Sequence, residues 1–303
     1  MAVYVNTNVS SLNGQRYLNN VQNSLNTTYT RLSSGLRINS AKDDSAGLQI
    51  ADRLTSQING LNQGNRNAND GIALAQTVEG GLDEISNMLQ RIRTLAVQSS
   101  NGTLGDDDRE SIQNEVDALT SEITRIAEQT TFGGKKILMG YNGGDSIYGT
   151  TATANAGATK AGLILHVGAN TGDTINMEVY SFQFTKLANA AGLNANNLGA
   201  TADTFSVSTQ CGANRTITSI DAMIDVVDSQ RAELGAIQNR LESSIRNQSN
   251  VSANSADARS RIRDADFAEE SANLSQQSII QQAATSMLMQ ANTRPQLALS
   301  MLG

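Results

Sequence analysis

The sequence predicts a mainly α protein, in which a long antiparallel helical rod or coiled coil is built from both termini and a small β-hairpin region lies in the centre. Three observations lead to this fold class. Apolar residues alternate at spacings of three and four near both ends of the 303-residue chain, as in helices that pack on other helices. The only proline, Pro295, is close to the C-terminus, so no earlier helix meets a proline break. A central glycine-rich stretch carries two runs of alternating apolar residues, which is typical of a hairpin.

The first predicted helix lies within residues 5–36. Leu18, Leu25 and Leu32 recur every seven residues, and Asn, Gln, Ser and Thr fill most of the positions between them. Residues 1–30 hold a single charged side chain. A polar helix with one thin apolar stripe is marginal in isolation. We therefore expect this segment to need a partner helix.

The far end of the chain supplies the expected partner. Residues 271–303 also carry one charge, Arg294, and Leu274 and Leu288 share a seven-residue register. The two ends should pack on each other as a two-helix unit, and other copies of the chain should bury the apolar and amide surface that is left over. The residues that we expect to make these contacts are Val5, Val9, Leu12, Leu18, Leu25, Leu32, Leu36, Leu274, Ile280, Ala284, Met287 and Leu288.

The segment after the first helix predicts a linker and then a second long helix. Residues 40–47 break the apolar stripe, which resumes at Ala51. The stretch 60–71 is rich in Asn and Gly, so we expect a kink or a soft spot in the helix there. From Ala75 the stripe is regular, and it should end near Ser100, before an Asn-Gly turn signal.

A third helix and a hairpin follow. The three aspartates at 106–108 favour a helix N-terminus, and the helix should stop before Phe132. Apolar residues then alternate at 163–167 and again at 175–179, with turn residues at 168–173 between them. This pattern predicts a β-hairpin.

The chain returns to a helical pattern after the hairpin. Residues 181–215 are small and polar, and we expect loops with one or two short strands. Thr218 and Asp221 have the spacing of a capping pair and predict the start of another long helix, which should run toward Ala256.

These elements predict a symmetric arrangement of three parts, with a long rod and a small head. The first part is a terminal helical domain made of residues 1–45 and 257–303. The second is a helical rod domain made of residues 46–140 and 215–256. The third is a short glycine-rich β and loop region at 141–214, which belongs partly to the rod and partly to a surface-exposed variable segment.

Composition argues against several classes of function. The net charge of −7 disfavours nonspecific binding to nucleic acid, which depends on Lys and Arg. No run of about 18 apolar residues predicts membrane insertion, and the N-terminus lacks the regions of a conventional signal peptide. His166 is the only histidine, Cys211 is the only cysteine, and neither HExxH nor a phosphate-binding loop motif occurs. We expect no enzyme activity, no metal and no cofactor.

Several sequence blocks resemble bacterial flagellins. The blocks are VNTN at 5–8, LSSGLRINSAKDDSAG at 32–47, QRIRTLAVQ at 90–98, QRAELGAIQNRL at 230–241 and SRIRDAD at 260–266. Long blocks in a fixed order are a far more specific signal than one short motif. The resemblance covers about residues 1–140 and 215–303, whereas the central insert matches weakly and is short for the family.

The resemblance implies a structural subunit that polymerises into the extracellular filament of the bacterial flagellum for swimming motility. It implies export in an unfolded state through the flagellar type III apparatus. The terminal helices would line an inner tube and the next helices an outer tube. The expected partners are other copies of the chain, an export chaperone that binds the C-terminal region, and the hook-associated and cap proteins.

Two groups of residues are candidates for contacts with other proteins. The first group could form ion pairs between subunits or could be a solvated linker; it comprises Lys42, Asp43, Asp44, Asp257, Arg259, Arg261, Arg263, Asp264 and Asp266. The second group matches positions at which an innate immune receptor of animals recognises some flagellins; it comprises Gln90, Arg91, Leu95 and Glu115. The alternative for the second group is a helix surface that is buried between subunits.

Two other functions stay open from the sequence alone. A junction protein between hook and filament resembles flagellin at both ends but is present in few copies. A monomeric secreted effector or adhesin would tolerate loss of both termini. A filament subunit should instead lose polymerisation when about the first 35 or the last 40 residues are removed.

Overall fold

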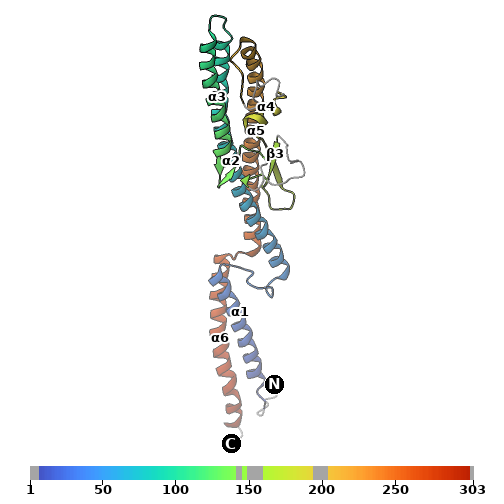
Figure 1. Ribbon diagram of the computed structural model, residues 1–303. Helices are drawn as coiled ribbons and strands as arrows, with labels where there is room; N and C mark the ends of the chain where they lie inside the picture. Colours follow the sequence, from blue (N-terminus) through green and yellow to red (C-terminus); the bar gives the residue numbers. More distant parts are fainter. Residues whose placement is uncertain (1–6, 141–144, 149–159, 194–203, 301–303) are drawn as a thin grey trace. The chain divides into compact units, whose positions relative to one another are not determined.

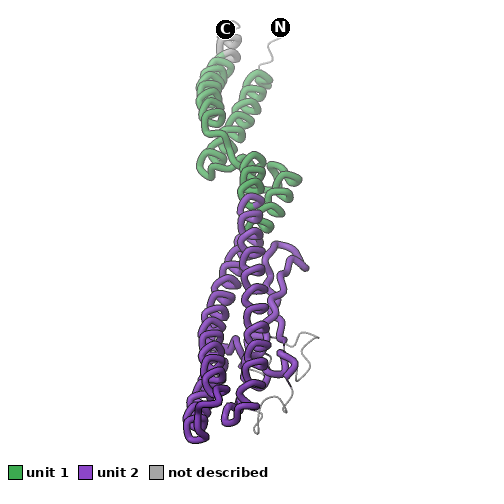
Figure 2. The backbone as a smooth tube through the Cα atoms, turned by 90° about the horizontal axis from the view of Figure 1, so that it is seen from above, with its two compact units in different colours: residues 1–58, 252–303 green, residues 59–251 purple. Residues whose placement is uncertain are grey.

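The structure is a computed structural model that describes residues 7–140, 145–148, 160–193 and 204–300, without the side chains of 294–300. It divides into two compact units, drawn in different colours in Figure 2. We call residues 1–58 and 252–303 the terminal unit, and residues 59–251 the central unit.

The described chain is dominated by helices, and its strands form two small antiparallel pairs, β1 with β2 and β3 with β4 (Figure 1). The predicted mainly α class with a small central hairpin is confirmed. In chain order the elements are α1 (Val9–Ser34), α2 (Ser45–Ser99), α3 (Asp106–Gln129), β1 (Thr131–Phe132), β2 (Lys135–Lys136), β3 (Lys160–His166), β4 (Thr174–Tyr180), α4 (Phe184–Ala190), α5 (Gln210–Arg263) and α6 (Phe267–Ser300).

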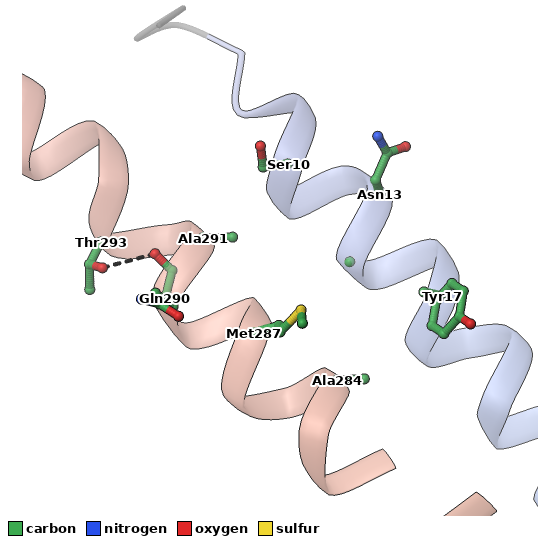
Figure 3. Close-up of a pocket in the computed structure, with 9 residues that line it drawn as sticks. Ser10, Asn13, Tyr17, Ala284, Met287, Gln290, Ala291 and Thr293 are labelled. Atoms are coloured by element: carbon green, nitrogen blue, oxygen red, sulfur yellow. Dashed lines mark hydrogen bonds between the residues drawn. The ribbon is translucent and has the colours of Figure 1, made fainter. Parts of the chain in front are cut away.

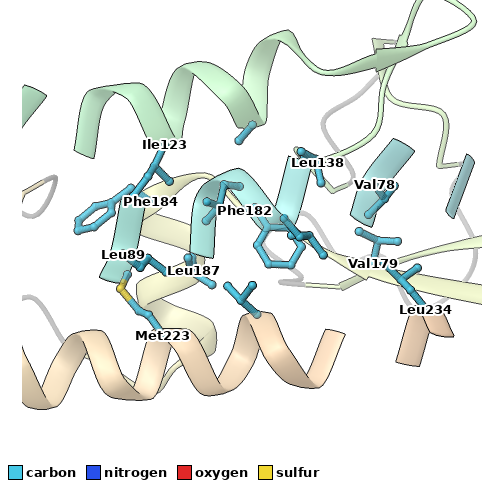
Figure 4. Close-up of a cluster of buried hydrophobic side chains, with 14 of the residues drawn as sticks. Val78, Leu89, Ile123, Leu138, Val179, Phe182, Phe184, Leu187, Met223 and Leu234 are labelled. Carbon is cyan, nitrogen blue, oxygen red and sulfur yellow. The ribbon is translucent and has the colours of Figure 1, made fainter. Parts of the chain in front are cut away.

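The central unit contains a continuous hydrophobic core. The regular stripe predicted from Ala75 onward lies on α2 and is buried, and Leu82, Ile85 and Leu89 are all 0% exposed. Side chains from α3, α5, the hairpin and α4 meet it, as Figure 4 shows. The labelled members of this cluster are Val78, Leu89, Ile123, Leu138, Val179, Phe182, Phe184, Leu187, Met223 and Leu234.

The stretch 60–71 lies inside α2, which continues through it as a helix. The glycines there allow the hairpin to approach the helix. A Cβ atom at Gly60 would lie 2.8 Å from the Cβ of Ala169, and one at Gly64 would overlap the carbonyl of Val167. The glycines at these positions therefore permit close packing of the hairpin on α2.

The start of α5 also differs from the prediction, since the helix begins at Gln210 rather than near Thr218. The Thr209 hydroxyl accepts a hydrogen bond from the Gly212 backbone N–H at 3.1 Å, which caps the earlier start. Ala213 in the first turns is buried, so the added turns contribute to the core. Small polar residues concealed these turns from an apolar-periodicity argument.

Part of the segment predicted as loops and short strands is helical. The chain from Phe184 to Ala190 forms α4, and Phe184 and Leu187 are buried. The rings of Phe184 and Phe205 meet edge to face with centroids 5.0 Å apart. Residues 194–203 of the predicted loop segment lie outside the described residues.

The predicted hairpin is confirmed. β3 and β4 are antiparallel, with Leu163 opposite Met177 and Leu165 opposite Ile175. His166 ends β3 as an exposed residue.

In the terminal unit, α1 and α6 lie side by side and run antiparallel (Figure 1). Gly35 ends α1 in the left-handed conformation with a φ of 70°, which a glycine adopts without strain. The linker that follows α1 pairs with the connection between α5 and α6. The Arg37 N–H donates to the Arg263 carbonyl at 2.7 Å, and the Ala265 N–H donates to the Gly35 carbonyl at 3.0 Å.

Candidate assembly interface

Helices α1 and α6 form the candidate interface, and α1 faces α6 with one narrow stripe. The stripe is confirmed as a buried or half-buried row with alternating spacings of three and four. Gly14 lies in this row and allows a close approach, because a Cβ atom there would be 2.9 Å from Cδ1 of Leu288. The members of the row are Ser11, Gly14, Leu18, Val21, Leu25, Thr28 and Leu32.

Three polar contacts connect α1 with α6. At one end the Asn8 Nδ2 donates to the Ala291 carbonyl at 2.8 Å. Near the other end the Thr28 hydroxyl donates to Oε1 of Gln277 at 3.2 Å. A third contact joins two charged side chains near the linker end of the pair. The chain positions of these contacts run in opposite directions on the two helices, so they set one antiparallel register.

The third contact is an ion pair between Arg31 and Glu270, with 3.0 Å between the guanidinium nitrogen and the carboxylate oxygen. The Glu270 side chain is 9% exposed, whereas that of Arg31 is 32% exposed. A partly buried pair of this kind loses more when one partner is removed than an exposed surface pair does. It therefore anchors the end of the helix pair next to the linker.

The contact between α1 and α6 buries little apolar surface. Among the described side chains of these two helices, Leu25 is the one hydrophobic residue that is buried. The described part of the central unit, by contrast, buries dozens of hydrophobic residues. A helix in a protein gains most of its stability from packing its apolar face against other elements. The terminal helix pair is therefore held far less firmly than the helices of the central core.

The outward surface of the pair is mostly polar but exposes a set of apolar side chains, and it carries a groove of about 810 Å³ (Figure 3). Tyr17 of α1 and Met287 of α6 are 64% and 72% exposed. In Figure 3 they lie on facing sides of the groove, and Ala284 and Ala291 line it from α6. Other exposed apolar residues of the two helices are Val9, Leu12, Tyr29, Phe267, Ile279 and Met289.

The structure places the residues predicted for packing at different depths. Val9, Leu12 and Met287 are 54%, 53% and 72% exposed, so they do not belong to the contact within one chain. Val5 lies outside the described residues. Contact with another copy at these positions stays a prediction. Leu25 is buried, and the half-buried members of the set are Leu18, Leu32, Leu36, Leu274, Ile280, Ala284 and Leu288.

Three of the predicted charged residues cap local structure. Oδ2 of Asp43 accepts hydrogen bonds from the Ser40 N–H at 2.9 Å and the Asn39 N–H at 3.1 Å, and these backbone bonds lower the pKa of the carboxyl. Asp44 accepts from the Gly47 N–H at 2.9 Å at the start of α2. Asp266 accepts from the Ala268 N–H at 2.8 Å at the start of α6.

The remaining predicted charges have contacts within the chain or none among the described residues. Arg261 pairs with Asp257 on the same helix at 3.0 Å. Arg259 donates to the hydroxyl of Thr55 at 3.3 Å. Lys42 is exposed and has no ion pair in the described part of the chain. Ion pairs between subunits stay a prediction for this group, whose other members are Arg263 and Asp264.

The proposed receptor residues do not form one exposed patch. Arg91 on α2 pairs with Glu115 on α3, with 2.6 Å between Nη2 and Oε1, and both side chains are about half exposed. Gln90 is exposed beside them. Leu95 is only 2% exposed and belongs to the core of the central unit. In the isolated chain, a protein that binds this face would reach Gln90, Arg91 and Glu115 but not the Leu95 side chain.

Sequence reasoning missed the polar residues that join the two terminal helices. Asn8 carries a local signal, because asparagine directly before a helix is a preferred cap. Nothing in the pattern pairs it with Ala291, which is 283 positions away. The sequence likewise contains no signal that Thr28 would choose Gln277.

The described part of the chain shows neither a metal-ion cluster nor a membrane-spanning helix. No group of three or more His, Cys, Asp or Glu side chains is arranged to hold a metal ion in this part of the chain. Within the same residues, no helix has both the length and the apolar character needed to cross a membrane.

Comparison with known proteins gives a consistent result. The bacterial flagellin N-terminal helical region matches residues 5–143, and the bacterial flagellin C-terminal helical region matches residues 217–302. Polar flagellin B/D of Vibrio parahaemolyticus is 38% identical and flagellin D of Vibrio anguillarum is 39% identical, each over 100% of both chains. A solved structure of a putative flagellar hook-associated protein from Vibrio parahaemolyticus covers 73% of this chain and 100% of its own. Its TM-score is 0.57 at 17% identity, so the likeness concerns the fold alone.

Proposed function

The chain belongs to the bacterial flagellin family and is a non-enzymatic subunit of the extracellular flagellar filament, and we propose that other copies bind it through the outward faces of α1 and α6. The observation that carries this proposal is the contrast in burial between the two units. The central unit has its own core, whereas the terminal pair buries Leu25 and leaves Tyr17 and Met287 open.

Burial between copies would supply what the pair lacks. A fully buried aliphatic or aromatic side chain stabilises by roughly 1.5–3 kcal/mol relative to an exposed one. Several such residues on each copy would therefore add to the stability of the two helices on assembly. The scarcity of charge on α1 also means that close stacking does not bring like charges together.

The contacts between copies must be heterologous. When one surface binds a different surface and the rotation does not close a ring, copies add without limit and form an open helical filament. The groove of Figure 3 is one such surface, and a neighbouring copy's exposed apolar side chains are the occupant that fits it.

The experiment that tests this proposal is a charged substitution in the groove. Met287→Asp places a carboxylate on the apolar surface, and burying an unpaired charge is strongly unfavourable. We expect purified Met287→Asp chains to stay unassembled at concentrations where the wild type forms filaments, as seen by electron microscopy after seeding. The circular dichroism of the central helices should not change.

Ile164→Asp is the matched control. Ile164 is 54% exposed on β3 of the central unit, so the substitution adds the same charge to an exposed apolar position outside the terminal pair. These chains should polymerise like the wild type. Normal filaments from Met287→Asp, or equal loss in both variants, would contradict the proposal.

We also propose that the chain is exported unfolded through the flagellar type III apparatus and that a chaperone binds its C-terminal region before assembly. The support is that α6 presents Ile279, Met287 and Met289 to solvent at 66%, 72% and 65% exposure. An apolar face of this kind needs cover until a neighbouring copy arrives. Deletion of α6 should abolish chaperone binding measured by calorimetry, and retained binding would refute this part.

The filament needs partners at its two ends, and we propose that hook-associated and cap proteins bind the same terminal helices. The division into a terminal domain (1–45 and 257–303), a rod domain (46–140 and 215–256) and a central region (141–214) is proposed for the filament. A junction protein between hook and filament is a weaker candidate. The likeness to a hook-associated structure is one of fold, whereas the relatives at 38–39% identity are flagellins along their whole length.

An animal immune receptor could bind the central unit of the free chain. We propose that it would contact Gln90, Arg91 and Glu115, because these residues are exposed and adjacent. Arg91→Ala should then weaken receptor activation by the monomer. Arg93→Ala is the comparison, since Arg93 is exposed and forms a similar ion pair with Asp221 at 2.6 Å.

A further inference from the structure

Helix α6 contains a proline that leaves one carbonyl group without a helical partner. In an α-helix each N–H donates to the carbonyl four residues earlier, and proline has no N–H. Pro295 lies within α6, which continues to Ser300. The carbonyl that loses its donor is therefore that of Ala291.

The donor that replaces it comes from the other end of the chain. The Asn8 Nδ2 donates to the Ala291 carbonyl at 2.8 Å, while its Oδ1 accepts from the Ser11 N–H at 3.1 Å. One amide side chain thus caps α1 with its oxygen and satisfies α6 with its nitrogen. Serine, threonine and aspartate cap helices as well as asparagine does, but none of them supplies this second donor at the same length.

The apolar stripe cannot set the height of α1 on α6 by itself. Leu18, Leu25 and Leu32 are identical residues seven positions apart, so a slip by one heptad exchanges leucine for leucine. In coiled coils a single polar group at such an interface specifies the register.

The other interhelical contacts lie toward the opposite end of the helix pair. Thr28 donates to Gln277 and Arg31 pairs with Glu270, so these two contacts hold the end next to the linker. Among the described residues, Asn8 makes the side-chain hydrogen bond that joins the start of α1 to α6. Proline is what leaves a carbonyl inside a helix without an N–H donor four residues later. Because the chain has one proline, this happens at one position of α6.

We propose that Asn8 and Pro295 act as a pair that docks the start of α1 at one height on α6. Pro295 leaves the Ala291 carbonyl without a helical donor, and the Asn8 side chain donates to it instead. This pairing brings Gly14 opposite Leu288 and aligns Ser10 and Asn13 with the α6 side of the groove. The inference deepens the proposed function and rests on it, since the groove matters only if copies bind there.

A double-mutant cycle on the full-length chain tests the pairing. The four proteins are the wild type, Asn8→Ser, Pro295→Ala and the double variant, and the readout is the critical concentration for seeded polymerisation. Serine keeps the cap but does not reach Ala291, and alanine at 295 restores the helical N–H. A hydrogen bond of ordinary strength corresponds to about a three- to tenfold change in an equilibrium constant.

The pairing predicts coupling between the two sites. Asn8→Ser should raise the critical concentration about three- to tenfold when Pro295 is present, and less than about twofold when residue 295 is alanine. Pro295→Ala alone should raise the critical concentration by a similar factor, because the carbonyl that docks Asn8 is then bonded within α6.

Three results would overturn the inference. Asn8→Ser could have no effect, it could have the same effect in both backgrounds, or Pro295→Ala alone could polymerise like the wild type. The proposed function has a separate test in Met287→Asp, so polymerisation of the wild type with loss in Met287→Asp would leave that proposal standing while this one falls.

Discussion

Gln230 shows at the residue scale how a buried polar side chain can belong to a sheet. It is 0% exposed on α5, its Oε1 accepts from the Tyr180 N–H at 3.1 Å, and its Nε2 donates to the Glu178 carbonyl at 2.9 Å. The amide therefore pairs with the edge of β4 as a neighbouring strand would. The sequence predicted the apolar members of the α5 stripe, but a glutamine among them reads as a surface residue.

Replacement of Gln230 by leucine should destabilise the central unit. The substitution keeps the volume but leaves one N–H and one carbonyl of β4 unpaired, which costs about 1–3 kcal/mol. Urea unfolding of the monomer followed by circular dichroism measures the change. Asn239→Leu, at an exposed position of the same helix, should stay within about 0.5 kcal/mol. Equal effects from the two variants would refute the role given to Gln230.

Asp43 predicts a pH dependence of the linker that follows α1. Hydrogen bonds from the Ser40 and Asn39 N–H groups favour the charged carboxylate and lower its pKa below the usual 3.8. A depressed pKa means that the contribution of Asp43 to stability is complete above about pH 4 to 5 and is lost as the pH falls through the lowered value. The linker should therefore not respond between pH 5 and 8.

Carbon-13 NMR of the Asp43 carboxyl measures this pKa directly. The expected titration midpoint is below the usual 3.8 of an aspartate. A midpoint for Asp43 at or above that value would show that the backbone bonds are absent in solution.

At the scale of elements, periodicity predicted which segments are helices better than where they begin. The stripes of α1, α2 and α3 were identified from spacing because apolar side chains on one face are a property of the local sequence. The early start of α5 and the whole of α4 were missed. The first turns of α5 and the helix at Phe184 are stabilised by contacts with the core, and local spacing does not contain those contacts.

The glycines of α2 give a prediction at the same scale. Gly64→Ala should destabilise the central unit by about 1–3 kcal/mol, because the new methyl group would overlap the Val167 carbonyl and displace the hairpin. Gly80→Ala is the matched variant, since nothing lies within 4 Å of its Cβ position. Alanine there should stabilise the helix by about 0.5–1 kcal/mol.

Thermal unfolding of both variants provides the measurement. The expected shifts have opposite signs, although the two substitutions are chemically identical and lie in one helix. If Gly64→Ala were as stabilising as Gly80→Ala, the hairpin would not pack against α2 as described.

At the scale of the whole molecule, the sequence predicted the pairing of the two ends but not what sets their alignment. Low charge and repeated leucines at both termini identified two helices that need partners. The contacts of Asn8 with Ala291 and of Arg31 with Glu270 join positions more than 230 residues apart, and no local rule connects them. The same composition agrees with our proposal that the central unit folds on its own core whereas the terminal unit needs other copies of the chain.

Backbone amide hydrogen exchange of the monomer and of the filament tests this dependence most directly. The core of α2 serves as the internal reference and should be protected in both states. The account predicts that amides of α1 and α6 exchange orders of magnitude faster than this core in the dilute monomer and become protected in the filament. Strong protection of both terminal helices in the dilute monomer, equal to that of the core, would contradict it.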